Sequence, residues 1–160
     1  MGDITPHFSR HEFGLPEAKA REYGFEAAEY PAEWAETRLR PLCDALELLR
    51  DKLGGKRVRV ISGYRPKAYD MARIAAGRKG VSPNSQHHDG RAADLQIEGV
   101  EPAAVYAAVL ALAEAGRVLV RTGVMPNLIT IGGVGVYDEF VHVDIRPSEG
   151  PVKTWDERSR

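Results

Sequence analysis

The sequence predicts an α+β fold, in which a small antiparallel sheet has helices packed on one face. Leucines that recur every three or four residues between 32 and 53 indicate a long amphipathic helix, and residues 102–115 show a similar pattern. Apolar and polar residues alternate over 56–62 and again over 140–145, which is the period of a β-strand. The strands that we expect to pair contain Val58, Asp94, Leu128 and Phe140.

Length and composition indicate one globular domain covering residues 1–160. A chain of 160 residues can bury a real core, and its 43% hydrophobic and 28% charged residues are ordinary proportions. The net charge of −1 provides no basic field for nucleic acid or for an anionic membrane, so neither is expected as a partner. Cys43 is the only cysteine, which excludes an intrachain disulfide and a cysteine metal site. We expect a monomer.

The two ends of the chain are expected to be less regular than the middle. Residues 1–31 are predicted to form an irregular lead segment with one short helix at 16–23. Residues 147–160 are polar and are predicted to form a loose tail, with Trp155 as its one anchor. No apolar run reaches the roughly 20 residues of a membrane span, and no secretory signal is visible. The chain is therefore expected to be cytoplasmic as synthesised.

The first half of the domain is predicted to alternate between helix and strand. Pro41 interrupts the helix at 32–53, so we expect a kink there or two abutting helices. The strand at 56–62 is followed by a turn and a helix at 67–76. Residues 77–84 contain Gly and Pro among polar residues, which predicts a loop.

The second half is predicted to continue with one helix and several short strands. The helix at 102–115 is expected to end at Gly116, with strands at 118–120 and 128–131. The glycine-rich run 132–135 precedes a strand and not a helix, which argues against a phosphate-binding loop. Close backbone packing near a site explains such glycines better.

Two of the predicted strands carry polar residues on the face away from the core. In the strand that begins at Asp94, Leu95 and Ile97 face the core and Asp94 faces away. In the strand at 140–145, valine and isoleucine occupy the core face, which leaves His142 toward a cleft. The alternation therefore places a carboxylate and an imidazole on the open face of one sheet.

Three residues have the types expected for ligands of one Zn²⁺ ion. His87, Asp94 and His142 offer two imidazoles and a carboxylate. A catalytic zinc site uses three such protein groups and keeps a fourth position for water. His87 is expected in a loop or a single turn, where Gly90 permits a backbone angle that other residues rarely adopt. The pattern therefore predicts a zinc-dependent hydrolase.

Several motifs resemble, in the same order, those of the M15 peptidases, the family of zinc D-Ala-D-Ala carboxypeptidases and peptidoglycan endopeptidases. They are Phe-x-x-x-Glu-Phe, Ser-Gly-Tyr-Arg, Ser-x-His-x-x-Gly-x-Ala-x-Asp and Phe-Val-His-Val-Asp, at 8–13, 62–65, 85–94 and 140–144. The similarity covers about residues 8–146. It implies the Hedgehog/DD-peptidase fold, with the zinc site on the open face of the sheet.

The resemblance also implies an activity and a place of action. The chain would be a zinc metallopeptidase that hydrolyses an amide bond next to a D-amino acid in peptidoglycan stem peptides or their precursors. D,D-carboxypeptidase and endopeptidase activity remain open. The site of action would be the bacterial cell wall, reached after removal of a signal or by release as for a phage lysin.

Two neighbouring carboxylates are candidates for the catalytic base. Glu139 stands three residues before His142, the Asp/Glu-x-x-His spacing that the resemblance implies for the base. On an unbroken strand, however, Glu139 would face away from His142, because side chains alternate. The assignment therefore requires a turn or bulge at residues 138–139. Asp138 has the right parity and is the alternative base, and neither residue having the role is the third possibility.

Further residues are candidates for the surroundings of the metal. Arg65 at a strand end could hold a substrate carboxylate in a bidentate pair, or could form an ion pair within the fold. The resemblance favours Arg65 and Ser85 as substrate contacts. Asp144 shares a face with His142 and could orient its imidazole. His88 is expected to be exposed or, at most, a substrate contact.

A second functional class stays open beside the peptidase. The same fold could form a zinc-binding module that has lost catalysis and acts in binding or as a structural component. Hedgehog signalling domains resemble this fold and show that the option exists. Both classes would bind zinc, so turnover of stem peptides distinguishes them.

Overall fold

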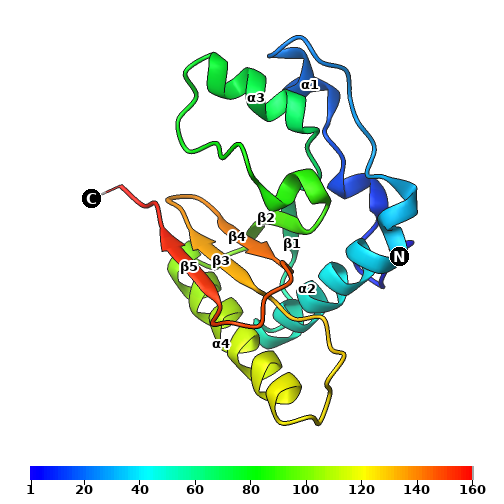
Figure 1. The fold of residues 1–160 in the computed structure, drawn as a ribbon, viewed down its shortest axis with the longest axis vertical. Coiled ribbons are helices and arrows are strands. Elements are labelled where there is room, and N and C mark those ends of the chain that lie inside the picture. The colour runs from blue at the N-terminus through cyan, green and yellow to red at the C-terminus, as the bar shows by residue number, and fades with distance from the viewer. Residues whose placement is uncertain (160) are drawn as a thin grey trace.

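A mixed five-stranded sheet forms the centre of the computed structural model, which describes residues 1–159 (Figure 1). The strands are β1 Val58–Ser62, β2 Ala92–Ile97, β3 Gly133–Val136, β4 Val141–Asp144 and β5 Lys153–Asp156. Their order is β1-β2-β4-β3-β5, and all neighbours are antiparallel except β3 and β5, which are parallel. The predicted α+β class is confirmed, and β5 makes the sheet mixed where a wholly antiparallel one was expected.

Two helices cover one face of this sheet. Leu46 of α2 (Arg40–Lys52) and Val109 of α4 (Pro102–Arg121) are fully buried in one apolar cluster with Leu95 of β2 and Val143 of β4. Each such side chain contributes about 1.5–3 kcal/mol when it is removed from water. The helical segments are η1 Arg10–Phe13, α1 Glu17–Arg21, η2 Ala32–Trp34, η3 Ala35–Leu39, α2 Arg40–Lys52, α3 Lys67–Ala75, η4 Gln86–Asp89 and α4 Pro102–Arg121. The opposite face of the sheet has no such helical cover, as Figure 1 shows.

The long helix predicted for residues 32–53 is a run of three helical segments. It begins as the 3-10 turn η2, widens into the π-helix η3 and becomes the regular α2 at Arg40. Pro41 lies in the first turn of α2, where its missing N–H costs no helical hydrogen bond. The expected interruption at Pro41 is confirmed.

The predictions for residues 116–131 were wrong. α4 continues through Gly116 to Arg121, so residues 118–120 are helical and not a strand, and the next strand is β3 at Gly133–Val136. A short apolar run does not distinguish helix from strand by periodicity alone. Gly116 does not stop the helix but makes room for a neighbour, since a Cβ on it would lie 3.0 Å from Cγ2 of Thr130.

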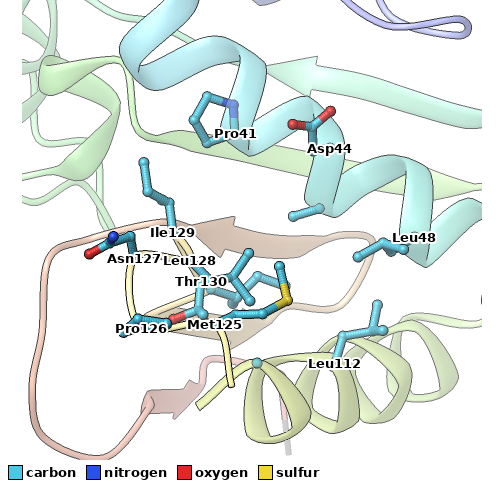
Figure 2. A pocket seen from close by; sticks show the side chains of 13 residues that line it. Pro41, Asp44, Leu48, Leu112, Met125, Pro126, Asn127, Leu128, Ile129 and Thr130 are labelled. Carbon is cyan, nitrogen blue, oxygen red and sulfur yellow. The ribbon is translucent and has the colours of Figure 1, made fainter. Parts of the chain in front are cut away.

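An apolar groove lies between α2, α4 and the loop that follows α4 (Figure 2). Its volume is about 510 Å³, and Leu48, Leu112, Met125 and Ile129 are among the side chains that line it. Asp44 is the one charged residue in its lining. Within residues 1–159, the group of side chains suited to a metal ion is elsewhere, on the open face of the sheet.

Helix α4 is a long helix of mainly apolar composition. By length and composition alone, it is long and apolar enough to cross a membrane. In this fold, Val105, Ala108, Val109 and Ala113 are its buried residues. The expectation that no apolar run reaches the length of a membrane span was therefore wrong, because α4 passes this test. The absence of a membrane partner stays a prediction.

The tail predicted to be loose contains β5, which extends the sheet beside β3. Trp155 lies opposite Gly135, and a Cβ on that glycine would come within 2.2 Å of the indole ring. Gly135 therefore leaves the space in which Trp155 lies, which explains why β5 can pair closely with β3. Trp155 was predicted as the anchor of the tail, and the strand around it was missed.

Candidate metal centre

One row of residues crosses the sheet and places two of the predicted ligands side by side. Asp94 of β2 is the direct partner of His142 on β4. His142 is in turn opposite Gly135 of β3, and Gly135 is opposite Trp155 of β5. Directly opposed residues point to the same face of a sheet, with Cβ atoms about 4.5–5.5 Å apart. The carboxylate and the imidazole therefore meet on the open face, as their sequence parity predicts.

The third predicted ligand comes from the single turn η4. Ser85 caps this turn, and its Oγ accepts a hydrogen bond of 3.2 Å from the backbone N–H of His87. Gly90 ends the turn with a φ of +66°, a conformation that favours glycine. The turn directs the His87 ring toward β2, where it is buried with 2% of its surface exposed.

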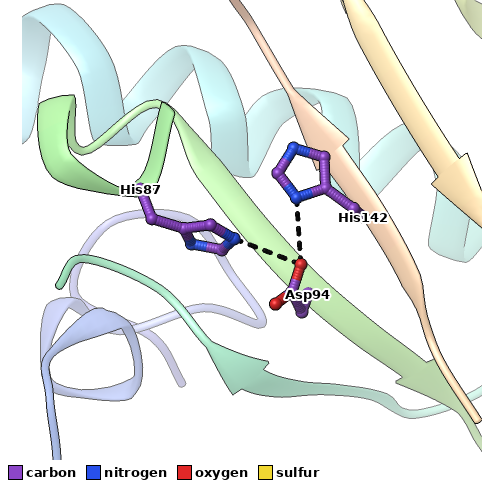
Figure 3. A group of neighbouring side chains, drawn as sticks. All are labelled: His87, Asp94 and His142. Atoms are coloured by element: carbon purple, nitrogen blue, oxygen red, sulfur yellow. Dashed lines mark hydrogen bonds and ion pairs between the residues drawn. The ribbon is translucent and has the colours of Figure 1, made fainter. Parts of the chain in front are cut away.

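The three side chains converge on one point (Figure 3). Oδ1 of Asp94 lies 3.2 Å from Nε2 of His87 and 3.0 Å from Nδ1 of His142. One ligand atom from each residue lies within 4.8 Å of the others. Zinc bonds of about 2.0–2.1 Å in a tetrahedron place neighbouring ligand atoms about 3.3 Å apart. The two distances to Asp94 are therefore close to those of a tetrahedral zinc site.

Both nitrogens of each imidazole face an oxygen atom, an arrangement that suits a metal ion between the rings. Nδ1 of His87 faces the carbonyl oxygen of Gly63 at 2.6 Å, and Nε2 of His142 faces Oδ2 of Asp144 at 2.9 Å. The other nitrogen of each ring faces Asp94. A neutral imidazole has one N–H and cannot satisfy two oxygen acceptors, so each ring requires either a second proton or a metal ion opposite its second nitrogen. Ligating histidines usually donate their other N–H to an oxygen, as Nδ1 of His87 and Nε2 of His142 are placed to do.

The electrostatics of the cluster favour a charged carboxylate between the rings. Burial acts to raise the pKa of Asp94, but the facing His87 and His142 outweigh it and hold that pKa well below its usual range. Burial lowers the pKa of His87. For His142 burial is outweighed by hydrogen bonds to Asp144 and Asp94, which raise its pKa to about 8. Asp94 is thus a negative charge in a buried place, which is the condition for binding a cation.

Asp144 is held in place from three sides. It is fully buried, and the guanidinium of Arg146 binds both carboxylate oxygens, with Nε 2.8 Å from Oδ1. A Cβ on Gly133 would lie 2.4 Å from Oδ2 of Asp144, so only glycine fits beside this carboxylate. Gly133 and Gly135 thus leave room for the side chains that support His142. This close packing is the role expected for the glycine-rich run.

A second buried carboxylate supports the site and was not singled out from the sequence. Asp70 of α3 is fully buried and accepts hydrogen bonds from Nε of Arg65, Nη1 of Arg73 and Nε2 of His88, at 3.1, 2.7 and 2.7 Å. Nη1 of Arg65 also lies 3.7 Å from Oδ2 of Asp94. Arg65 therefore links the two carboxylates by ion pairs within the fold, the alternative that its sequence position left open.

The expectation that His88 is exposed was wrong. Its side chain is 9% exposed and its Nε2 donates to Asp70. Because η4 is a tight 3-10 turn, successive side chains diverge, and His88 points to Asp70 while His87 points to Asp94. His88 therefore supports the fold of the turn that carries a predicted ligand.

The two candidates for the catalytic base lie at the tip of the β3–β4 hairpin. The turn that Glu139 requires is present, since the backbone N–H of Tyr137 donates to the carbonyl of Phe140 at 3.0 Å. Glu139 and Asp138 are both exposed, and Asp138 accepts hydrogen bonds from the N–H and the Oγ of Ser159. Neither residue lines the two cavities around the cluster. The role of either residue as base stays a prediction.

Two adjoining cavities give the cluster an open face. One, of about 460 Å³, is lined by all three predicted ligands together with Ser85 and Arg65. The other, of about 700 Å³, shares Arg65 and Asp94 with the first. Five cationic side chains line this second cavity: Lys19, Arg65, Arg73, Arg78 and Lys79.

Tyr137 lines both cavities and was also missed at the sequence level. It stands two residues after Gly135, so strand parity places it on the same open face. That signal was present in the sequence, and it became readable only once β3 was located at Gly133–Val136.

The chain is similar to known peptidoglycan peptidases. Residues 35–155 match a model of the peptidase M15 group described as peptidoglycan L,D-endopeptidase MepK. A probable peptidoglycan L,D-endopeptidase MepK of Haemophilus influenzae is 33% identical over 100 residues, which cover 61% of this chain and 42% of that protein. The peptidoglycan L,D-endopeptidase MepK of Escherichia coli is 32% identical over 117 residues, covering 71% of this chain and 52% of that protein.

The matches cover only part of each relative. The matched part of the chain spans about half the length of these curated relatives. No solved structure matches the chain significantly. The range 35–155 contains the three predicted ligands and Trp155.

Proposed function

We propose, from the premise that the chain belongs to the peptidase M15 family, that it is a zinc-dependent peptidoglycan endopeptidase. The observation that carries the proposal is the convergence of His87, Asp94 and His142 at the floor of an open cleft. The names of the two relatives favour an amide bond between an L- and a D-configured centre in peptidoglycan peptides. An L,D-endopeptidase cleaves a different bond from a D,D-carboxypeptidase. It still agrees with the expected hydrolysis of an amide bond next to a D-amino acid.

Zinc is the proposed cofactor because the donor set fits it. His87 would bind through Nε2, His142 through Nδ1 and Asp94 through Oδ1, the atoms that already face one another. When bound, zinc would polarise the scissile carbonyl and lower the pKa of a water molecule to near 7. Gly63 and Asp144 hold the outer nitrogens of the two rings, so the ligand geometry exists before any ion arrives.

The proposed substrate is an anionic peptide, for which the charge of the cleft provides support. Five cations line the larger cavity, against three carboxylates, of which Asp94 is a proposed ligand. Arg78 and Lys79 are exposed in the loop beside it. Stem peptides carry free carboxylates, which such a wall attracts. Ser85 and Arg65 line the cleft but already serve the fold, so direct contact with substrate is a further part of the proposal.

Glu139 is the proposed base, with Asp138 as the alternative. A base must lie within about 3 Å of the proton that it removes, or act through one water. Glu139 meets the spacing of the family motif, and the turn at residues 137–140 frees it from strand alternation. The tip of the hairpin must rotate its carboxylate toward the cleft for this role. Within residues 1–159 its side chain has no hydrogen bond or ion pair that would oppose the rotation.

A second candidate function is a zinc-binding module without turnover. The observation that favours it is that neither Glu139 nor Asp138 lines the cleft. Such a module would bind peptidoglycan peptides through the same cationic wall and would release them unchanged.

Mass spectrometry of muropeptides after incubation with the zinc-loaded protein distinguishes the two functions. The substrates are cross-linked and monomeric muropeptides, with chelator-treated protein and the variants Glu139→Gln and Asp138→Asn in parallel. An endopeptidase splits an internal L,D amide bond, and chelation abolishes the cleavage. Loss of a terminal alanine would instead identify a carboxypeptidase. Zinc-loaded, folded protein that cleaves no stem peptide would contradict the proposal and support the binding module.

A further inference from the structure

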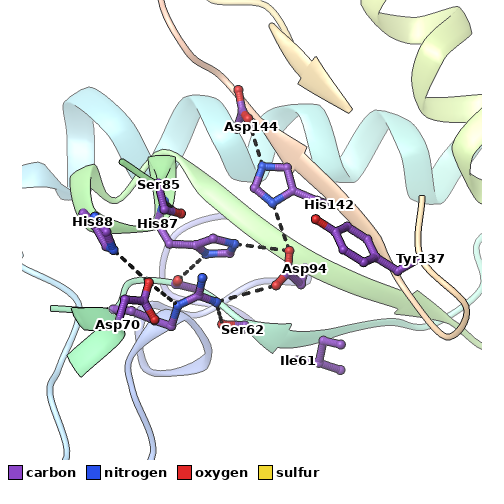
Figure 4. Close-up of polar contacts among 12 residues, drawn as sticks. Ile61, Ser62, Asp70, Ser85, His87, His88, Asp94, Tyr137, His142 and Asp144 are labelled. Atoms are coloured by element: carbon purple, nitrogen blue, oxygen red, sulfur yellow. Dashed lines mark hydrogen bonds and ion pairs between the residues drawn. The ribbon is translucent and has the colours of Figure 1, made fainter. Parts of the chain in front are cut away.

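The Tyr137 side chain is fixed beside the metal centre on the open face of the sheet. It follows β3 and lines both cavities together with Asp94 (Figure 4). Its ring is stacked on Phe140, with the ring centres 4.3 Å apart and the planes 11° from parallel. The stack joins the two sides of the β3–β4 hairpin, so the hydroxyl group is carried on a rigid support.

The hydroxyl of Tyr137 accepts one hydrogen bond within the protein. Nε1 of Trp155 lies 2.9 Å from it. An indole N–H is a donor only, so the phenolic oxygen is the acceptor and its own proton must point elsewhere. Within residues 1–159, no side chain or carbonyl accepts that proton. Tyr137 therefore offers the cleft an oriented hydroxyl proton that no described residue accepts.

Trp155 is itself held firmly, which fixes the direction of this donor. Its indole occupies the space above Gly135, and its centre lies 5.0 Å from that of His142. In addition, the guanidinium of Arg146 lies over the Trp155 ring, 5.5 Å from its centre. The same residue therefore contacts a proposed zinc ligand and positions the Tyr137 hydroxyl.

Two guanidinium groups near the cluster already bind groups of the fold. Nε and Nη1 of Arg65 bind Asp70 and Ser62, and Nη1 of Arg73 binds Asp70. The hydroxyl proton of Tyr137, in contrast, has no acceptor among residues 1–159. Burial raises the pKa of its hydroxyl, so the group keeps this proton at neutral pH.

We propose that Tyr137 donates a hydrogen bond to the carbonyl oxygen of the scissile amide, and a stronger one to the same oxygen as it gains negative charge. Trp155 is the positioning residue for this donor. No proton is transferred, and the hydrogen bond strengthens as the charge on the oxygen develops. This inference rests on the proposed peptidase function and assigns one further catalytic residue to it. Removal of one such donor in other enzymes lowers kcat by about 10²–10³-fold.

The variant Tyr137→Phe removes the hydroxyl and leaves the ring stack in place. We expect kcat on the cleaved muropeptide to fall by about 10²-fold, with little change in KM, because the hydrogen bond matters most in the transition state. Zinc content and the unfolding temperature should stay close to those of the unmodified chain. Tyr106→Phe is the matched control, since Tyr106 packs against the core on α4, and it should leave kcat unchanged. Trp155→Phe should lower kcat less than Tyr137→Phe does.

A binding measurement tests the inference separately from the activity. A phosphinate analogue of the scissile dipeptide places a negatively charged oxygen where the amide oxygen would gain charge. Calorimetry on the zinc-loaded proteins should show binding at least about 10-fold weaker for Tyr137→Phe, while the uncharged substrate-like amide binds both alike. Equal affinity of both proteins for the phosphinate would overturn the role of Tyr137, whether or not the chain cleaves peptides. Absence of phosphinate binding to the zinc-loaded, folded chain would overturn it as well. Cleavage by the unmodified chain with equal phosphinate affinities would leave the proposed function intact.

Discussion

The two faces of strands β2 and β4 are made of alternate residues and are stabilised in different ways. On the face toward α2 and α4, Leu95 and Val143 are buried among apolar side chains. On the other face, Asp94 and His142 are also buried, with 8% and 7% of their surface exposed, and are held by directional contacts to charged partners. The first face tolerates small adjustments of its partners, since hydrophobic burial has no direction. The second depends on each partner being in place, because an unpaired buried charge is costly.

The apolar groove and the polar cleft differ in the same way. The groove between α2 and α4 offers a hydrophobic surface with one charged residue, Asp44. The cleft on the open face has converging ligands, a buried carboxylate network and an oriented hydroxyl. The proposed chemistry on a peptide bond requires such fixed polar groups, so we assign the function to the cleft and not to the more apolar groove.

The largest contrast between the faces is expected from two adjacent residues of β4. His142→Ala should abolish zinc binding and muropeptide cleavage, because it removes one of three ligands. Val143→Ala should keep one zinc per chain and lower the free energy of unfolding by about 1–3 kcal/mol, through lost burial and a small cavity. Zinc analysis of both purified proteins and denaturant unfolding measure the two effects. Zinc retained in His142→Ala at the level of the unmodified chain would remove the distinction between the faces.

The next largest effect is expected at Asp70. Asp70→Asn should lower the free energy of unfolding by about 3–5 kcal/mol, because Arg65 and Arg73 would lose a buried counter-charge. Denaturant unfolding at neutral pH gives this value. A change below about 1 kcal/mol would show that solvent or other carboxylates replace Asp70 with ease.

The same residue gives a prediction for acid. Burial acts against the charged form of Asp70, but Arg65, Arg73 and His88 outweigh it and hold its pKa below the ordinary value. The stability from Asp70 is therefore complete above about pH 4, the pKa of the unfolded chain, and is lost as pH falls toward the lower folded pKa. The free energy of unfolding, measured from pH 6 down to pH 2, should fall less steeply with pH for Asp70→Asn than for the unmodified chain. Identical acid profiles would contradict the assigned pKa direction.

A smaller effect is expected at Asp144, which faces the ring of His142 and is not itself a proposed zinc ligand. Asp144→Asn keeps the shape but removes the charge that faces Nε2 of His142. The affinity for zinc should fall by about 10–100-fold with the protein still folded. Competition with a chelator of known affinity measures the change, and Asp138→Asn at the exposed hairpin tip is the control. Unchanged affinity would mean that Asp144 serves Arg146 and the fold alone.

The sequence was most informative where chemistry and strand parity agreed. Residue type together with the ordered family motifs selected His87, Asp94 and His142, and strand alternation predicted that Asp94 and His142 share one face. The structure brings all three within 4.8 Å. The family resemblance is confirmed by the match over residues 35–155.

Other features depended on tertiary contacts that local patterns do not encode. Residues 118–120 are apolar in a way that suits helix and strand alike, and only the packing of α4 on the sheet decides between them. β5 pairs with β3 because Gly135 leaves room for Trp155, a relation between residues 20 positions apart. Asp70 has a local partner in Arg73, three residues on in α3, but its burial and its contact with His88 of η4 depend on the tertiary fold.

X-ray absorption spectroscopy of the zinc-loaded chain tests the central claim most directly. Loading with one equivalent of zinc should give a single site with nitrogen and oxygen neighbours at about 2.0–2.2 Å and the scattering pattern of two imidazoles. His87→Ala and His142→Ala should each lose this pattern. Failure of the folded chain to bind one equivalent, or an imidazole signal that survives both substitutions, would show that His87, Asp94 and His142 do not hold the metal.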